Sequence, residues 1–240
     1  MRAMHDDPGV RMPVADRAAP IFYTAEVEFP DGGVDEFVDW FSGRHAADLF
    51  KAGFETCACY RAIEGEYTIL DVYQAASRDI FTSPEYAACS KDRYASAILT
   101  RARGHENTVY EYLPLPGAIA GEPLAAIDAD WFSSLRFDVH PDADDDLITT
   151  LTEREIPRLR GFGASVVRLV RRAGDRPVGK PSARPRYALA VEWLTEPPPL
   201  AWLLKGLDPF VPQPLRAEDG FAGVRVFPWP DRPHLRVGKL

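Results

Sequence analysis

The sequence VDEFVDWFSGRHAADLFKAGF, residues 34–54, decides how the rest of the chain is interpreted. At about 100° per residue of an α-helix, one apolar arc of this segment contains Val34, Val38, Phe41, Leu49 and Ala52. His45 falls near the centre of that arc, where a leucine is expected. A buried imidazole must find hydrogen-bond partners or lose its charge. His45 is therefore the first candidate for chemistry, and a satisfied core histidine is the alternative.

Strand patterns lie on both sides of this helix. Alternating apolar and polar residues predict strands at residues 21–29, 54–63, 67–74 and 107–113, the middle two forming a hairpin. Ser83 and Pro84 are typical of a helix start, and the second helix is expected to run to about residue 103. The order β-α-β-β-α-β predicts a ferredoxin-like unit.

The second half of the chain is a degenerate copy of the first. Its strands are predicted at residues 131–139, 162–172, 186–195 and 221–227, with a helix ending at Gly161 and a short helix within 196–214. Gly53 and Gly161 are 108 residues apart, as are Tyr23 and Trp131, which indicates an internal duplication. At this offset Glu153 takes the place of His45, so a single site would belong to the first half. Pro157 is expected to shorten or kink the helix.

The predicted domain organisation has five parts. They are a flexible leader (1–19), a first ferredoxin-like unit with the site (20–115), a Pro-, Gly- and Ala-rich linker (116–129), a second unit (130–228) and a C-terminal tail (229–240).

Composition excludes several function classes. The net charge of -8 has no basic patch, which argues against nucleic acid as a partner. The sequence has no 18-residue apolar span and no signal peptide, so we expect a cytoplasmic protein that does not enter a membrane. Cys57 and Cys59 share a strand face, and their spacing does not suit zinc, so these and Cys89 are expected to be reduced thiols with no metal bound. Sequence motifs of dinucleotide, NTP, serine-hydrolase and zinc-protease sites are absent.

Several short motifs together resemble the dimeric α/β-barrel superfamily, especially its EthD-like members. They are Trp40-Phe41, Arg44-His45, Gly53-Phe54, a hairpin strand that ends in Tyr73, and Ser83-Pro84-Glu85-Tyr86. The resemblance covers residues 21–113 well and 130–228 weakly. It implies an α+β fold in which two tandem ferredoxin-like units pack sheet to sheet as an intramolecular α/β barrel, either as a monomer by internal pairing or as a homodimer.

The resemblance also implies where a ligand lies, between a sheet and its two helices. Catalytic candidates there are His45 as general base or acid, Tyr60 and Tyr73 as hydrogen-bond donors and Asp71 as a group that orients the imidazole. Candidates for substrate binding are Tyr23, Trp40, Phe41, Phe54 and Arg44. The alternation places Tyr60 on one face of its strand and Asp71 with Tyr73 on one face of the adjacent strand, and whether these two faces coincide stays open. Each tyrosine also has an explanation as a packing residue. Asp71 has the alternatives of facing solvent or of pairing with Arg44 or Arg61.

The functional hypothesis is a cofactor-independent cyclase or isomerase that acts on a polyketide-like or aromatic carbonyl compound by proton transfer at His45. Its substrate would be an apolar or aromatic small molecule. A cofactor-free monooxygenase on the same scaffold and a non-catalytic small-molecule binding protein stay open as alternatives. A haem enzyme with His45 as axial ligand is a further alternative.

Overall fold

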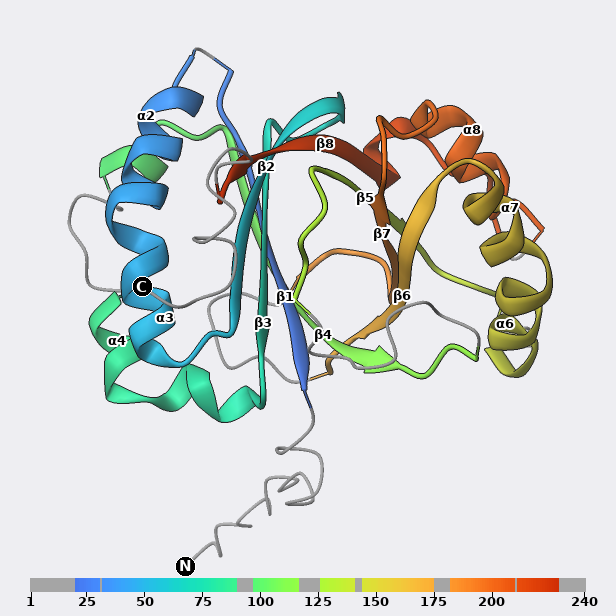
Figure 1. Cartoon of the computed structure of the whole chain (residues 1–240), viewed down its shortest axis with the longest axis horizontal. Coiled ribbons are helices and arrows are strands. Elements are labelled where there is room, and N and C mark those ends of the chain that lie inside the picture. Colours follow the sequence, from blue (N-terminus) through green and yellow to red (C-terminus); the bar gives the residue numbers. More distant parts are fainter. Residues whose placement is uncertain are drawn as a thin grey trace, which may run out of the picture.

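The computed structural model of the chain describes residues 20–30, 32–89, 97–116, 126–140, 144–174, 182–209 and 211–228. The predicted leader and tail, and residues 117–125 of the predicted linker, lie outside these ranges. Within them, the strands form a closed antiparallel barrel, and helices cover it on two opposite sides (Figure 1).

The predicted order of elements is confirmed in both halves. The first half contains β1 (Ile21–Glu28), α2 (Val34–Trp40), the π-helical turn η1 (Phe41–His45), α3 (Ala46–Ala52), β2 (Thr56–Gly65), β3 (Ile69–Ala75), the 3₁₀ turn η2 (Arg78–Thr82), α4 (Pro84–Cys89) and β4 (Gly104–Leu113). The second contains β5 (Trp131–Phe137), α6 (Asp144–Thr150), the π-helical turn η4 (Leu151–Glu155), α7 (Ile156–Gly161), β6 (Ala164–Arg172), β7 (Tyr187–Trp193), α8 (Leu200–Lys205), the 3₁₀ turn η5 (Ala217–Asp219) and β8 (Gly220–Phe227). The helix predicted over 83–103 is described at Pro84–Cys89 and again as helical at 97–99; residues 90–96 are outside the described part.

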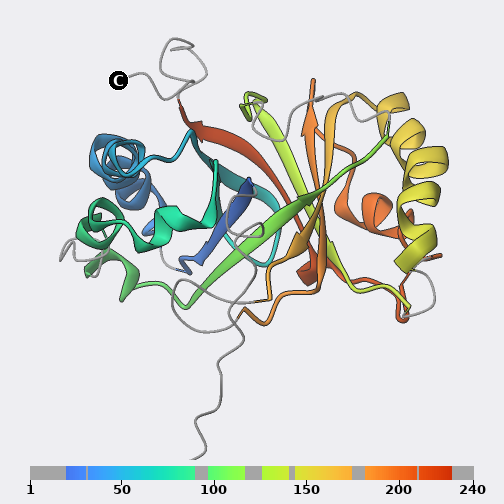
Figure 2. The ribbon, with the colours of Figure 1, turned by 90° about the horizontal axis from the view of Figure 1, so that it is seen from below.

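The barrel joins two ferredoxin-like sheets within one chain. Its strand order is β1-β3-β2-β8-β5-β7-β6-β4, so each half contributes four neighbouring strands, ordered β4-β1-β3-β2 and β8-β5-β7-β6. The halves meet where β2 pairs with β8 and where β4 pairs with β6. The predicted fold class, two tandem units forming an intramolecular α/β barrel, is confirmed. Seen from below, the helices of the two halves lie on opposite sides of the shared barrel (Figure 2).

Each strand serves two cores because successive side chains point to opposite faces of a sheet. On β1, Tyr23, Ala25 and Val27 belong to an outer core beneath the helices of the first half, whereas Phe22 belongs to the barrel interior. The second half has its own outer core beneath α6, α7 and α8. The barrel interior is thus filled with side chains, and each half keeps a separate space between its sheet and its helices.

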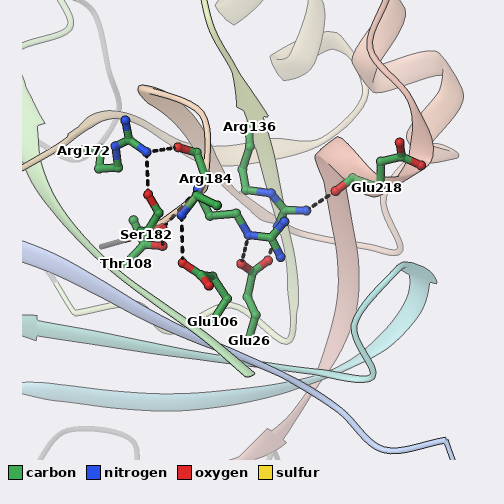
Figure 3. Close-up of polar contacts among 9 residues, drawn as sticks. Glu26, Glu106, Thr108, Arg136, Arg172, Ser182, Arg184 and Glu218 are labelled. Atoms are coloured by element: carbon green, nitrogen blue, oxygen red, sulfur yellow. Dashed lines mark hydrogen bonds and ion pairs between the residues drawn. The ribbon is translucent and has the colours of Figure 1, made fainter. Parts of the chain in front are cut away.

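Buried charged side chains from both halves meet at the barrel (Figure 3). The carboxylate of Glu26, on β1, lies between two guanidinium groups, forming ion pairs with Arg136 of β5 and with Arg184, whose Nε lies 2.6 Å from Glu26 Oε2. The side chains of Glu26 and Arg136 are each 2% exposed, and that of Arg184 is 13% exposed. Arg136 also donates to the backbone carbonyl of Glu218.

The last residues of the predicted linker contact a second group of side chains of the barrel interior. Arg225 of β8 is fully buried and forms ion pairs with Asp128 and Asp130. Ile127 is buried in the interior core, and the backbone carbonyl of Ala129 accepts a hydrogen bond from Tyr60. Residues 127–130 are therefore attached to the barrel interior by the buried side chain of Ile127, by the Tyr60–Ala129 hydrogen bond and by the two ion pairs of Arg225.

A π-helical turn interrupts the first long helix of each half. Such a turn inserts one residue into an α-helix and so rotates the residues on its C-terminal side about the helix axis. In the first half the core contacts of Phe41 are continued by Ala46, five positions on, so Ala46 takes the buried place expected for His45 and the imidazole is only half-buried. In the second half the break at Leu151–Glu155 precedes Pro157, which sits in the first turn of α7. Both halves therefore share this interruption of the helix, and the first half forms it without a proline.

The turns also correct the repeat offset. Phe41–His45 corresponds to Leu151–Glu155, and Gly53, with φ of 106°, corresponds to Gly163, with φ of 97°. Both comparisons give 110 residues. The predicted offset of 108 and the predicted match of Glu153 with His45 are therefore wrong. The helix does end at Gly161, as predicted, but the left-handed glycine that matches Gly53 is Gly163. The structural counterpart of His45 is Glu155.

Candidate functional site

A cavity of about 220 Å³ lies between the outer face of the first sheet and the helices that cover it. The walls come from β1, β3 and β4 on the sheet side and from α2, η1, α3 and α4 on the helix side. The described residues that line it are Tyr23, Ala25, Val27, Phe37, Trp40, His45, Leu49, Asp71, Tyr73, Tyr86, Cys89, Leu99, His105 and Asn107. Most are apolar or aromatic, with a few convergent polar groups, which is the usual make-up of a small-molecule site.

The π-helical turn brings His45 to the cavity wall. Its ring stacks on Trp40 with 4.4 Å between ring centroids and 20° between planes, and it meets Phe41 edge-on at 5.8 Å. The stacking on Trp40 and the edge contact with Phe41 together hold the plane of the imidazole ring. π-helical turns are frequent at functional sites, and this one changes which side chain faces the cavity.

Strand pairing determines which side chains form the sheet side of the cavity. Tyr23 of β1 is paired with Tyr73 of β3, and Ala25 with Asp71, so Asp71 and Tyr73 sit under the helices two positions apart. The rings of Tyr23 and Tyr73 stack at 5.2 Å. Phe54 and Phe81 pack against Tyr23 at 6.4 and 5.3 Å. These contacts fix the aromatic side of the cavity.

Asp71 is the unusual group of this wall. Its residue exposure is 2%, and burial raises the pKa of its carboxyl to about 7, while hydrogen bonds from Cys59 and Tyr73 act in the opposite direction. Its Oδ1 has no hydrogen-bond partner among the described residues. A carboxyl that titrates near neutrality can both accept and return a proton.

The neighbouring donors stay protonated. Burial raises the pKa of the Tyr73 hydroxyl well above its usual value, and the charge of Asp71 raises it further. The same two causes raise the pKa of the Cys59 thiol. Both groups therefore remain hydrogen-bond donors to Asp71 at physiological pH.

The structure gathers most of the predicted site residues around this cavity. His45, Asp71, Tyr73, Tyr23 and Trp40 line it, while Phe41 and Phe54 lie behind it, in ring contact with Tyr73 at 6.2 and 5.6 Å.

Two predicted residues are elsewhere. Tyr60 lies on the opposite face of the sheet, stacked on Phe132 inside the barrel, with its hydroxyl donated to Ala129 at 3.0 Å. The side chain of Arg44 is exposed on the helix surface. Arg61, proposed as a partner of Asp71, pairs instead with Asp35.

Among the lining residues that were not predicted as site residues, four have polar or ionisable side chains, namely Tyr86, Cys89, His105 and Asn107. Tyr86 belongs to the Ser83-Pro84-Glu85-Tyr86 motif, and its hydroxyl is hydrogen-bonded with Tyr23. His105 was expected to be exposed, and it is. Partial desolvation lowers the pKa of its imidazole below the usual value, although a hydrogen bond with Asn107 acts in the opposite direction. The alternation of β4, continued back from Val109, would have placed His105 and Asn107 on the same sheet face as Tyr23.

In the second half, a buried ion pair occupies the position that corresponds to His45. Glu155, the counterpart of His45, is 4% exposed and forms an ion pair with Arg158 at 2.8 Å. The Arg158 guanidinium stacks over Trp202 at 3.7 Å and donates to the carbonyl of Leu203. A Cβ at Gly206 would lie 2.1 Å from Arg158 Nη2, so α8 packs closely on this pair. Here an internal ion pair takes the place of the half-buried imidazole.

The cavity does not suit a haem. Pockets for drug-sized ligands measure about 300–1,000 Å³, and the 220 Å³ beside His45 is below that range. The described residues contain no cluster of three or more His, Cys, Asp or Glu that could hold a metal ion. Nor do the helices in that part of the chain include one long and apolar enough to cross a membrane.

Comparison with known proteins identifies the fold. No protein-family model matches the sequence, and no curated protein matches it. Solved structures do. An anthrone oxidase-like protein has a TM-score of 0.56 at 11% identity over 88% of this chain and 93% of its own.

Two further structures are of chlorite dismutase type. A protein provisionally named a chlorite dismutase has a TM-score of 0.54 at 13% identity, covering 87% of this chain and 95% of that one. A variant of the chlorite dismutase of Candidatus Nitrospira defluvii has a TM-score of 0.52 at 12% identity, covering 92% and 96%. The chain therefore shares the α+β barrel of ferredoxin-like units found in these proteins. At these identities the likeness concerns the fold alone.

Proposed function

We propose that this protein is an enzyme that moves a proton next to the carbonyl group of a small aromatic or polyketide-like molecule, without a cofactor, as a cyclase or isomerase. The observation that carries the proposal is that His45 and Asp71 both line one aromatic cavity. Proton removal next to a carbonyl needs a base near neutrality and a donor for the enolate oxygen. The EthD-like resemblance of the first half supports the same function.

The filled second half supports a single site per chain. Glu155 and Arg158 neutralise one another there, so that position offers no comparable proton acceptor. Because the barrel is closed by strands of one chain, we propose that the protein functions as a monomer.

Hydrogen exchange into a test ketone measures the proposed reaction directly. We expect the protein to accelerate deuterium uptake next to the carbonyl of 2-tetralone, a neutral bicyclic aromatic ketone, followed by NMR in D₂O. His45→Ala should lower the enzyme-dependent rate by roughly 10²–10⁴-fold. His140→Ala, the same change at an exposed histidine of the second half, is the matched control and should keep the rate. Equal rates in the His45 and His140 variants would exclude His45 from the reaction.

A monooxygenase is the second candidate, favoured by the likeness to an anthrone oxidase-like protein. The first step, formation of a carbanion next to a carbonyl, would be the same. An oxygen electrode separates the two, because an isomerase consumes no oxygen while it turns over its substrate. Tight binding of 2-tetralone with neither exchange nor oxygen uptake would instead support a non-catalytic binding protein.

A further inference from the structure

Asp71 is the one carboxyl group among the described residues that line the cavity. Tyr73 and Cys59 donate hydrogen bonds to its carboxylate, and both lie on the sheet. Its Oδ1 is buried and has no partner in the described part of the chain. A buried acceptor without a donor costs free energy, and a ligand that supplies a donor removes that cost.

The charges of the cavity restrict what this ligand can be. None of the described lining residues is Lys or Arg, so no fixed positive charge neutralises a carboxylate or phosphate. An anion would also be repelled by Asp71 once that group is ionised. The aromatic rings of Tyr23, Phe37 and Trp40 offer flat apolar contact surfaces. A neutral, planar molecule suits this arrangement.

We propose that Asp71 Oδ1 is the proton acceptor of the cavity, and that the ligand is a neutral planar molecule that presents an acidic C–H, or the O–H of its enol form, to that atom. The proposal deepens the proposed function and rests on it for the reaction step, although not for ligand binding. It replaces the expectation that Asp71 orients the imidazole, because the hydrogen bonds that hold Asp71 come from the sheet.

The reaction step balances without an added reagent. The C–H bond next to the carbonyl breaks, its proton binds Asp71 Oδ1, and its electron pair forms a carbon–carbon double bond as the carbonyl π electrons move to oxygen. Asp71 then returns a proton to the same carbon, which is exchange, or, where a carbon–carbon double bond of the substrate is conjugated with the enolate, to the far end of that conjugated system, which is isomerisation; either step restores both the carbonyl and the carboxylate. His45, on the helix side, donates a hydrogen bond to the enolate oxygen. Tyr73 has one hydroxyl hydrogen, given to Asp71, and is therefore a positioning residue.

The environment gives Asp71 a suitable basicity. Burial raises its pKa to about 7, while the bonds from Cys59 and Tyr73 lower it, and a base is most effective when its pKa lies near the working pH. The titratable groups that face this region come from every element around it, namely Tyr23 on β1, Cys57 and Cys59 on β2, Tyr73 on β3, His105 on β4, His45 on η1, and Tyr86 and Cys89 on α4.

Three naphthalene probes of one shape test the assignment by calorimetric binding. 2-Naphthol imitates an enol and donates an O–H, 2-methoxynaphthalene has no donor, and 2-naphthoate is an anion. At pH 8 we expect the natural protein to bind 2-naphthol roughly ten-fold or more tightly than 2-methoxynaphthalene, and 2-naphthoate no more tightly than the ether. The preference for 2-naphthol should increase between pH 5 and pH 8 as Asp71 ionises.

Variants test whether Asp71 is the cause of the preference for 2-naphthol and of its pH dependence. Asp71→Asn should lose most of the preference and all of its pH dependence, whereas Asp35→Asn, at an exposed carboxylate on α2, should keep both. Tyr73→Phe removes a donor to the ionised carboxylate, so the pKa of Asp71 rises and the midpoint of the pH profile should move to higher pH. A residue that only packs would leave that midpoint unchanged.

The outcomes distinguish the two proposals. Unchanged preference in Asp71→Asn, or tightest binding of 2-naphthoate, would overturn the assignment of Asp71. Persistence of 2-tetralone exchange in Asp71→Asn would also overturn it, while leaving a reaction at His45. An Asp71-dependent preference for 2-naphthol without any exchange would support this assignment and overturn the proposed function.

Discussion

Asp71→Asn is expected to make the protein more stable at pH 8, even though the same change removes its proposed proton acceptor. The pKa of this buried carboxyl is raised from 3.8 to about 7. Between these values the folded protein keeps a proton that the unfolded chain has lost, so stability falls as pH rises. At 1.36 kcal/mol per unit, the ionised carboxylate costs up to about 4 kcal/mol above pH 7. An amide has no charge to bury.

Thermal unfolding at two pH values measures this effect. At pH 4 the carboxyl is neutral in the folded protein, and the two proteins should agree within about 1 kcal/mol. At pH 8 the variant should unfold roughly 10 °C higher. A difference that is the same at both pH values would contradict the raised pKa. Gained stability with lost activity is the behaviour expected of a functional group that is costly to the fold.

Glu26→Gln is expected to cause the largest loss of stability, about 3–5 kcal/mol. The change leaves Arg136 and Arg184, which both contact the Glu26 carboxylate inside the barrel, without a neutralising charge. Glu26 belongs to the first half, whereas both arginines belong to the second. The pairing of the two halves should therefore weaken together with overall stability.

An exposed ion pair provides the control for that loss. Glu36 pairs with Arg101, and their side chains are 44% and 52% exposed. Glu36→Gln should change the free energy of unfolding by less than about 1 kcal/mol, measured by denaturant unfolding beside Glu26→Gln. Comparable losses in the two variants would mean that the buried network does not hold the halves together.

The fold was predictable because its signals are local. Alternation in residues 21–29 marks both faces of β1, and the structure places Tyr23 beneath the helices and Phe22 inside the barrel. Only the register separates Tyr60, which is paired with Leu70, from Tyr73, which is paired with Cys57; the alternation within each strand left this open. The alternation could not tell which of the two faces belongs to the cavity, because both are apolar and both are buried.

The candidate site was predictable only in part, because the helix that carries His45 is not a regular α-helix. A regular 3.6-residue period places His45 in the buried arc, whereas the π-helical turn gives that place to Ala46 and moves His45 to the cavity wall. The same turn in the second half corrects the repeat and identifies Glu155 as the counterpart. An i→i+5 bond leaves little trace in a hydrophobic pattern.

The charge environment of Asp71 also could not be predicted from the sequence. Its burial depends on the helices that pack over β3, and its donors Cys59 and Tyr73 come from two strands in register. The sequence offered Arg44 or Arg61 as partners instead. Only the register shows that Asp71 lies opposite Cys59, so that a neutral thiol occupies the place where a cation was considered.

A crystal structure of the protein with 2-naphthol tests the central claim most directly, that the ligand site is the aromatic cavity of the first half. We predict the naphthalene rings between β1, β3 and the helix of His45, with the hydroxyl oxygen within hydrogen-bond distance of Asp71 Oδ1. We predict no second molecule at the Glu155–Arg158 pair. Naphthol bound in the second half or inside the barrel, with the cavity of Asp71 empty, would contradict this claim.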